Sequence, residues 1–417
     1  TYLELYARLF VDLIPDICLI AAVKSDAKGN LYTGNNTEDT PTYVEAVGFK
    51  DGIVIAQVNE ISDVVNRVDI PGDWVDFIVK SDEPYAVEPI FTKDPAKITD
   101  EQILIAMMTI KGIYALHEVK TLNHGIGYNT AAIELLLPTY GESLKLKGKI
   151  CSNWVLNPHP TLIPAIESGW VSSICAFGGE VGMEKYIENR TDIFFTGKDG
   201  TLRSNRAVAQ VAGLYGIDMF VGSTLQMDYY GNSSTVTKNR ITGFGGAPNM
   251  GHNPNGRRHA TKAWMSLKGK GDYMSKGKKL VVQILTTKNK NGESNFVKRL
   301  DAIDVGKKAN MEITPIMIYG EDVTHVVTER GIAYLYKAES PELRKNLLAA
   351  IAGETELGKT VGNDKTVKYR NEGLIAYPQD LNIDPKAANK NLLAAKNFQD
   401  LADWSEGLYN IPDGFLP

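Results

Sequence analysis

The sequence of 417 residues is poor in cysteine, in long apolar runs and in net charge. Its three cysteines, Cys18, Cys151 and Cys175, form no CxxC pair and no disulfide framework, which indicates a reducing, cytoplasmic location. No apolar run approaches the roughly 18–20 residues that a membrane helix requires. A net charge of −5 gives no general attraction to nucleic acid. A hydrophobic content of 43% instead indicates a folded protein with a large core.

The common catalytic motifs are also missing from the sequence. The six histidines show neither an HExxH motif nor paired metal-ligand spacing, and no G-x-S-x-G motif occurs. No residue pattern therefore calls for a metal or an organic cofactor bound to this chain.

Strand-like and helix-like runs alternate, which predicts an α/β fold with largely parallel sheets flanked by helices. We expect a helix at 2–14, ended by Pro15, and buried strands at 17–23 and 52–58. Because no cap or turn precedes the first helix, the chain is expected to lack the N-terminal portion of its first domain.

A second domain is expected after a linker rich in Pro and Asp. Thr99 and Gln102 have the spacing of a capping box ahead of an apolar helix at 103–114. The boundary is placed at residue 97. This division predicts an N-terminal domain at 1–97 and a C-terminal domain at 98–417.

One pattern, D-x-x-G-N, occurs twice, at Asp26–Asn30 and at Asp228–Asn232. Asp and Gly are common turn residues, so the pattern fits two unrelated hairpin turns. It equally fits a duplicated α/β unit with one copy in each domain. Both explanations remain open at this point.

A glycine-rich turn, Gly125-Ile126-Gly127, precedes a predicted helix at 131–137. Such a turn presents backbone N–H groups at a helix N-terminus, where they attract anions. It matches neither a Walker loop nor the full dinucleotide fingerprint. Anion binding and close packing of a helix against a strand both remain open for this turn.

A second glycine-rich run lies at 243–251 and contains Gly245 and Gly246. Consecutive glycines allow two backbone N–H groups to converge, because no Cβ restricts the backbone. Converging N–H groups can form an oxyanion hole for a carbonyl that passes through a tetrahedral state. A flexible surface loop is the alternative explanation.

The segment 257–299 is strongly basic, with twelve Lys or Arg residues and two acidic residues. Few aromatic residues are interleaved with these charges, which disfavours nucleic acid as the ligand. An acidic protein or a phosphorylated ligand fits the segment better, and a solvated surface is the alternative.

Longer motifs occur along the chain at 37–41, 68–71, 123–127, 157–161, 203–206, 222–235, 243–249 and 256–259. Together they resemble the class I CoA-transferases, and among them the malonate decarboxylase alpha subunits. The resemblance covers essentially the whole chain and implies an α/β transferase with two CoA-transferase-like domains.

The resemblance also implies a reaction and partners. It implies that an acyl-carrier-protein thiol passes from acetate to malonate. It implies a CoA-like phosphoribosyl-dephospho-CoA arm on a separate carrier protein, with CoA as a further ligand, and decarboxylase beta and gamma subunits as partners.

The resemblance also suggests site residues. Class I CoA-transferases carry a catalytic Glu after the strand that follows the Gly-Ile-Gly helix, and the matching position is assigned here to Asn153. An amide cannot form the enzyme thioester that a carboxylate forms, so a non-covalent route is expected. The expected catalytic residues are Gly245, Gly246 and Asn153, and those expected to bind the substrate or the CoA-like arm are Gly125, Ile126, Gly127, Asn129, Arg203, Gln226, Asn249, Arg257 and Arg258.

Two other functions stay open at this stage. One is a covalent CoA-transferase that acts on free short-chain acyl-CoA, which the amide at position 153 disfavours. The other is a non-catalytic subunit that docks a carrier protein through the basic segment. The retained glycine motifs disfavour this second alternative.

Overall fold

The structure, a computed structural model, describes residues 2–34, 40–196, 204, 206–238, 240–242, 280–315 and 317–415. These residues divide into two compact units, each assembled from separate segments of the chain. The predicted division into CoA-transferase-like domains at 1–97 and 98–417 stays a prediction. Unit 1 comprises Thr1–Thr92, Asn153–Gly216 and Phe398–Pro417, and unit 2 comprises Lys93–Ser152 and Ile217–Asn397.

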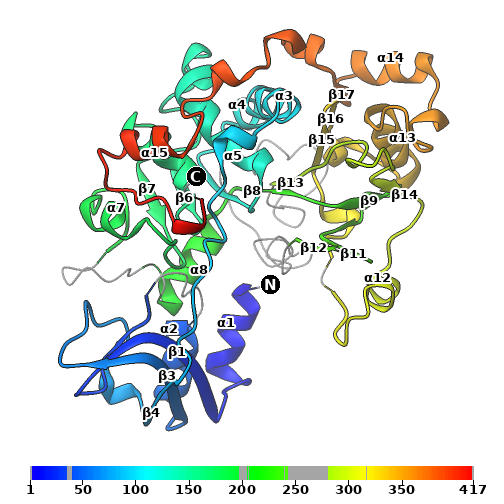
Figure 1. The fold of residues 1–417 in the computed structure, drawn as a ribbon. Coiled ribbons are helices and arrows are strands. Elements are labelled where there is room, and N and C mark those ends of the chain that lie inside the picture. The colour runs from blue at the N-terminus through cyan, green and yellow to red at the C-terminus, as the bar shows by residue number, and fades with distance from the viewer. Residues whose placement is uncertain are drawn as a thin grey trace. The chain divides into compact units, whose positions relative to one another are not determined.

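Unit 1 contains a four-stranded sheet of order β2-β1-β3-β4, drawn in blue in Figure 1. The strands β1, β3 and β4 are parallel, and β2 pairs antiparallel with the end of β1. Apolar side chains on one face of β1 and β3 pack with α2 into one core, so the existence of strands at 17–23 and 52–58 is confirmed. The strands are buried on that face only, because Leu19 of β1 and Ile53 of β3 are exposed. The bounds are α1 Tyr2–Val11, β1 Ile17–Asp26, β2 Leu31–Tyr32, α2 Thr40–Gly48, β3 Ile53–Ser62 and β4 Phe77–Lys80.

Two further parallel strands in unit 1, β6 and β7, pair with Asn153 opposite Ser173. The helix α8 packs against β7 and against α1, and α15 packs against α6. The remaining bounds in unit 1 are β6 Asn153–Val155, α6 Ile163–Glu167, β7 Ser173–Cys175, α7 Glu184–Asn189, α8 Ala207–Gly216 and α15 Phe398–Trp404.

Unit 2 contains six strands in the order β17-β16-β15-β13-β8-β5. The strands β5, β8, β13 and β15 run parallel, and every residue of β13 and β15 is buried, because helices α3, α5 and α13 pack against the sheet. The bounds of these elements are α3 Asp100–Thr109, β5 Thr121–His124, α5 Tyr128–Leu136, β8 Met219–Ser223, β13 Leu280–Ile284, β15 His325–Thr328, β16 Gly331–Ala333, α13 Pro341–Ile351 and β17 Ile375–Ala376.

Smaller strands and helices complete unit 2. The short strands β9, β10 and β14 form a three-stranded sheet, and β11 pairs with β12. Their bounds, with those of the remaining helices, are α4 Ala115–His117, β9 Gln226–Asp228, β10 Ser233–Ser234, β11 Val236–Thr237, β12 Arg240–Ile241, β14 Phe296–Val297, α12 Ala302–Lys308 and α14 Asn363–Asn371.

The helix α3 begins with the predicted capping box. The Thr99 hydroxyl accepts from the Gln102 backbone N–H, and the Gln102 side chain accepts from the Thr99 backbone N–H. The helix then continues through a π-helical turn at Ile110–Tyr114 into α4. The helix predicted at 103–114 therefore exists, but its last five residues are wound more widely than an α-helix.

The two D-x-x-G-N segments form the same turn. In unit 1, Asp26 accepts from the backbone N–H and the side-chain amide of Asn30. In unit 2, Asp228 accepts from the same two groups of Asn232. The central glycines, Gly29 and Gly231, both have positive φ, at +80° and +92°. The two turns are therefore equivalent atom by atom.

The equivalence extends to distant partners of each turn. The Asn30 side-chain oxygen accepts from Gly72 N–H at 3.0 Å, and the Asn232 oxygen accepts from Gly320 N–H at 2.8 Å. Each turn joins two antiparallel strands, β1 to β2 in unit 1 and β9 to β10 in unit 2. In both units the first of these strands also pairs with a parallel strand, β1 with β3 and β9 with β14. Two unrelated hairpins would not share these long-range contacts, so the structure supports a duplicated α/β unit.

Within the described ranges, no helix is long and apolar enough to cross a membrane. The same residues contain no group of three or more His, Cys, Asp or Glu side chains placed to hold a metal ion.

Candidate functional site

The loop Gly125–Gly127 lies at the carboxyl end of β5, beside the carboxyl end of β8. The two strands are parallel, with His124 opposite Val221, so their ends meet at one edge of the sheet. The Gly125 N–H donates to the Val221 carbonyl at 2.7 Å, and a Cβ on Gly125 would lie 3.4 Å from the Cα of Gly222. The loop approaches β8 closely because both Gly125 and Gly222 lack a side chain. Carboxyl ends of parallel strands are where α/β proteins bind ligands.

The helix α5 starts directly after this loop. Gly127 precedes its first residue and makes no side-chain cap, and the hydroxyl of Thr130 donates to the Gly125 and Gly127 carbonyls. Thr130 therefore fixes the loop against the first turn of the helix. The backbone N–H groups of that first turn have the polarity that favours an anion.

Asn129 connects the start of α5 to the end of β8. Its side-chain N–H₂ donates to the Ser223 hydroxyl at 2.9 Å. Its side-chain oxygen is buried and has no hydrogen-bond partner among the residues that the structure describes. The structure thus brings together Gly125, Gly127 and Asn129 of the predicted set, and adds Ser223, which the sequence analysis did not select. The half-buried Ile126 completes the loop.

A buried chain of hydrogen bonds lies behind the loop. His124, the last residue of β5, bonds through Nδ1 to Glu134 at 2.8 Å and through Nε2 to the Tyr114 hydroxyl at 2.7 Å. All three side chains are buried, and burial raises the pKa of Tyr114 well above its usual value. With the proton on Nδ1, His124 donates to Glu134 and accepts from Tyr114. These contacts hold the strand end from which Gly125 follows.

Gln226 lies at the beginning of β9, three residues after Ser223. It lines a cavity of about 450 Å³ with charged side chains of both signs, including Lys238, Arg240 and Lys308 and the acidic Asp301 and Asp304. The structure therefore places Gln226 in a different environment from that of Asn129.

Asn153 is the first residue of β6, and its side-chain oxygen accepts from the Ser173 hydroxyl at 2.9 Å. It therefore lies at the start of the strand, whereas the family's catalytic Glu is expected after the strand. The first amide side chain after β6 is Asn157, which sequence reasoning did not select. The catalytic role of Asn153 stays a prediction.

Six predicted site residues lie outside the ranges that the structure describes, so the roles assigned to them stay predictions. They are Arg203, Gly245, Gly246, Asn249, Arg257 and Arg258.

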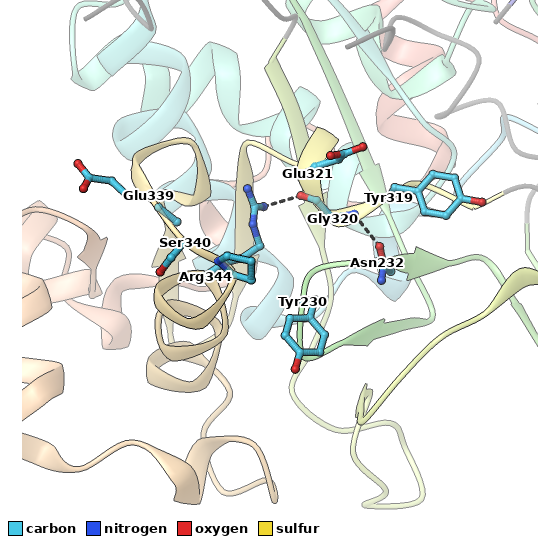
Figure 2. Close-up of a pocket in the computed structure, with 10 residues that line it drawn as sticks. Tyr230, Asn232, Tyr319, Gly320, Glu321, Glu339, Ser340 and Arg344 are labelled. Atoms are coloured by element: carbon cyan, nitrogen blue, oxygen red, sulfur yellow. Dashed lines mark hydrogen bonds between the residues drawn. The ribbon is translucent and has the colours of Figure 1, made fainter. Parts of the chain in front are cut away.

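A separate cavity of about 420 Å³ lies where the second D-x-x-G-N turn meets the start of α13. Figure 2 shows Asn232 and Arg344 both hydrogen-bonded to Gly320, with the side chains of Tyr230 and Tyr319 nearby. None of the predicted site residues lines this cavity. Two of its polar side chains, Asn232 and Arg344, are engaged with the Gly320 backbone that packs against the duplicated turn.

Comparison with known proteins agrees with the resemblance in the sequence. Residues 1–416 match the family model described as malonate decarboxylase, alpha subunit, transporter. The chain is 55% identical to an acetyl-S-ACP:malonate ACP transferase from Malonomonas rubra, over 100% of this chain and 76% of that protein.

Solved structures give the same result. A malonate decarboxylase hetero-tetramer from Pseudomonas, in complex with malonate, matches with a TM-score of 0.92 and 57% identity. A malonate decarboxylase alpha subunit from Acinetobacter baumannii matches with a TM-score of 0.91 and 57% identity. Both alignments cover 100% of this chain and 77% of the solved chain. By its sequence along almost its entire length and by its fold, this chain belongs to the malonate decarboxylase alpha subunit family.

Proposed function

We propose that this chain is an acyl-carrier-protein transferase that moves the carrier thiol from acetate to malonate. The net reaction is acetyl-S-carrier plus malonate, giving malonyl-S-carrier plus acetate. The observation that carries this proposal is the 55% identity, over the whole chain, to a relative named acetyl-S-ACP:malonate ACP transferase. The chain is accordingly an enzyme of the transferase class.

The proposed route uses no acyl–enzyme. A malonate carboxylate oxygen attacks the acetyl carbonyl carbon, and the carrier thiolate leaves. The resulting acetyl–malonyl anhydride is then attacked by the thiolate at its malonyl carbonyl, which releases acetate. Both steps pass through a tetrahedral oxyanion, so the protein has to position the reactants and stabilise negative charge.

The loop Gly125–Gly127 and the start of α5 are proposed to bind the CoA-like arm of the carrier. The close approach of Gly125 to Gly222 leaves backbone, without side chains, at this edge of the sheet. The first turn of α5 offers N–H groups to the phosphate oxygens of the arm. Asn129 and Gln226 contribute polar side chains to the same function.

The remaining roles follow the sequence motifs. Gly245 and Gly246 are proposed to form the oxyanion hole, and Asn153 to donate a hydrogen bond to the substrate. Asn249, Arg203, Arg257 and Arg258 are proposed to bind the negatively charged arm, since Arg forms paired hydrogen bonds with phosphate.

We also infer the assembly in which the chain works. A separate acidic carrier protein would bind the basic segment, and decarboxylase beta and gamma subunits would process the malonyl group. The similarity to the chain of a hetero-tetrameric malonate decarboxylase supports such an assembly. Two CoA-transferase-like domains and a cytoplasmic location complete the proposal.

An acyl-exchange assay tests this function directly. The purified chain is mixed with acetyl-carrier and isotopically labelled malonate, and the carrier is analysed by mass spectrometry. Labelled malonyl-carrier should form at a rate proportional to the amount of the chain. A carrier that remains acetylated while the protein is folded would contradict the proposal.

A further inference from the structure

Two polar side chains in unit 1 are completely enclosed yet lack the hydrogen bonds that burial requires. Asn157 is 3% exposed, and neither of its terminal atoms has a partner among the described residues. Glu180 is 0% exposed, and its Oε2 atom has no hydrogen-bond partner among the residues that the structure describes. Leaving such a group unpaired costs about 1–3 kcal/mol, so these unpaired atoms do not serve the stability of the fold.

Both residues follow neighbouring parallel strands. Asn157 comes two residues after the end of β6, and Glu180 comes five residues after the end of β7. The carboxyl ends of adjacent parallel strands form one edge of the sheet, which is the edge where α/β folds bind ligands.

The position of Glu180 is fixed by its other oxygen. Oε1 accepts from the backbone N–H groups of Phe91 and Thr92, at 3.1 and 2.9 Å, and from the Thr92 hydroxyl at 2.7 Å. The ring of Phe91 stacks on His159 with centroids 5.6 Å apart. His159 lies on the same loop as Asn157, so one compact group of contacts holds both strand ends.

Burial of Glu180 favours its neutral form, and its contacts decide which oxygen carries the proton. Burial raises its pKa, although the hydrogen bonds to Oε1 and the nearby His159 oppose the shift. A proton on the acid has to sit on Oε2, because three donors already occupy Oε1. The neutral acid therefore presents one O–H donor that no described residue accepts.

We propose that Asn157 and Glu180 bind a carboxylate group of the acyl acceptor, the amide through its N–H₂ and the acid through its Oε2–H. This rests on the proposed function, in which a free dicarboxylate enters the protein as the acceptor. Because neither terminal atom of Asn157 is engaged, the amide can turn its N–H₂ toward the anion. Two neutral donors hold an anion without the repulsion that an ionised Glu180 would add.

Two isosteric substitutions test the proposal with opposite expected results. Asn157→Asp removes the donor and adds a negative charge, so it should weaken malonate binding at least tenfold in isothermal titration calorimetry of the full chain. Glu180→Gln keeps a donor in place of Oε2–H, so it should bind malonate within about threefold of the wild type at low pH. Asn189→Asp, at an exposed position on α7, is the control for an added charge.

The pH dependence of malonate binding tests whether Glu180 takes part in it. As the pH rises through the raised pKa of Glu180, the acid loses its proton, and the wild type should bind malonate progressively more weakly. The affinity of Glu180→Gln for malonate should depend less on pH, because this variant lacks the titrating acid. Ionisation of malonate itself affects both proteins equally. The titratable groups that face Glu180 are His159 and Tyr409. A pH dependence that is unchanged in Glu180→Gln would show that Glu180 is not the titrating group and would overturn the proposal.

The transferase assay distinguishes this assignment from the proposed function. In Asn157→Asp the KM for malonate should rise at least tenfold, while the KM for acetyl-carrier should stay near the wild-type value. Wild-type transfer combined with unchanged malonate affinity in Asn157→Asp would overturn this site alone. If the wild type neither binds malonate nor transfers, the proposed function fails as well.

Discussion

His117 and His325 lie 208 residues apart in the chain and face each other inside unit 2, with their Nε2 atoms 3.0 Å apart. The Thr324 hydroxyl donates to the Val281 carbonyl, so His325 Nδ1 is the donor in its 2.9 Å contact with that hydroxyl. His325 Nε2 therefore accepts, and His117 Nε2 donates. The pair joins α4 to β15 and requires a neutral His325, because its Nε2 atom accepts the bond.

The histidine pair predicts a loss of stability in acid. Burial, aided by the charge of Lys337, lowers the pKa of His117 to about 4, and burial also lowers that of His325 well below its usual value. An unfolded His titrates near 6.5. The unfolded chain therefore binds more protons between about pH 6.5 and 4, so the free energy of unfolding should fall through this window and be unaffected above it.

Chemical denaturation at a series of pH values measures this effect. His117→Gln keeps a side-chain donor for His325 but removes one titrating group, so its stability should depend less on pH than that of the wild type. Carboxyl groups titrate in both proteins and cancel in the comparison. Equal slopes for the two proteins would show that this pair does not control acid stability.

The duplicated turn predicts equal sensitivity at two distant glycines. A Cβ on Gly320 would lie 2.1 Å from the Tyr230 carbonyl oxygen, and a Cβ on Gly72 would lie 2.1 Å from the Lys28 oxygen. Either Gly→Ala substitution should lower the free energy of unfolding by about 2–4 kcal/mol, because backbone has to move. Gly216→Ala, where a Cβ meets nothing within 4 Å, is the control and should be neutral or slightly stabilising. Urea denaturation of the three variants would show whether this order holds.

The oxyanion role of Gly245 and Gly246 predicts a large kinetic effect. Gly246→Pro removes one backbone donor, so transfer should slow by roughly 10²–10³-fold. Circular dichroism should first establish that the variant is folded. Transfer at the wild-type rate by a folded Gly246→Pro protein would remove these glycines from the mechanism.

The absence of a covalent intermediate predicts the form of the rate equation. When acetyl-carrier and malonate must be bound together, double-reciprocal plots of initial rate intersect instead of running parallel. Asn153→Ala should lower the rate and leave the intersecting pattern intact, while Asn189→Ala should change neither. Parallel lines, with an acyl group trapped on a Glu by hydroxylamine, would establish the covalent route in its place.

Local sequence signals account well for individual elements of this fold. The Thr99–Gln102 capping box and the alternating apolar residues of β1 and β3 depend on neighbours within a few positions, and all are confirmed. The D-x-x-G-N pattern located both duplicated turns, but not the glycines that complete them. Gly72 and Gly320 are 42 and 88 residues from their asparagine partners, so only the folded chain relates them.

The candidate site was less accessible to sequence reasoning. The close approach of Gly125 to Gly222 was compatible with the glycine-rich turn, but Asn129 meets Ser223 only because β5 and β8 pair. Asn157 begins one of the motifs that carry the family resemblance, but neither Asn157 nor Glu180 is marked as a site residue by its neighbours in the sequence. What distinguishes them is burial without hydrogen bonds, which depends on the packing of the whole unit.

The π-helical turn between α3 and α4 has a consequence for chain length. Such a turn contains one residue more than an α-helical turn, because each bond spans five residues instead of four. The surplus residue is taken up locally and does not rotate the following side chains by the roughly 100° that one residue adds in a regular helix. A deletion of Lys111 should therefore convert the turn to ordinary α-helix while Tyr114 still reaches His124 and His117 still reaches His325.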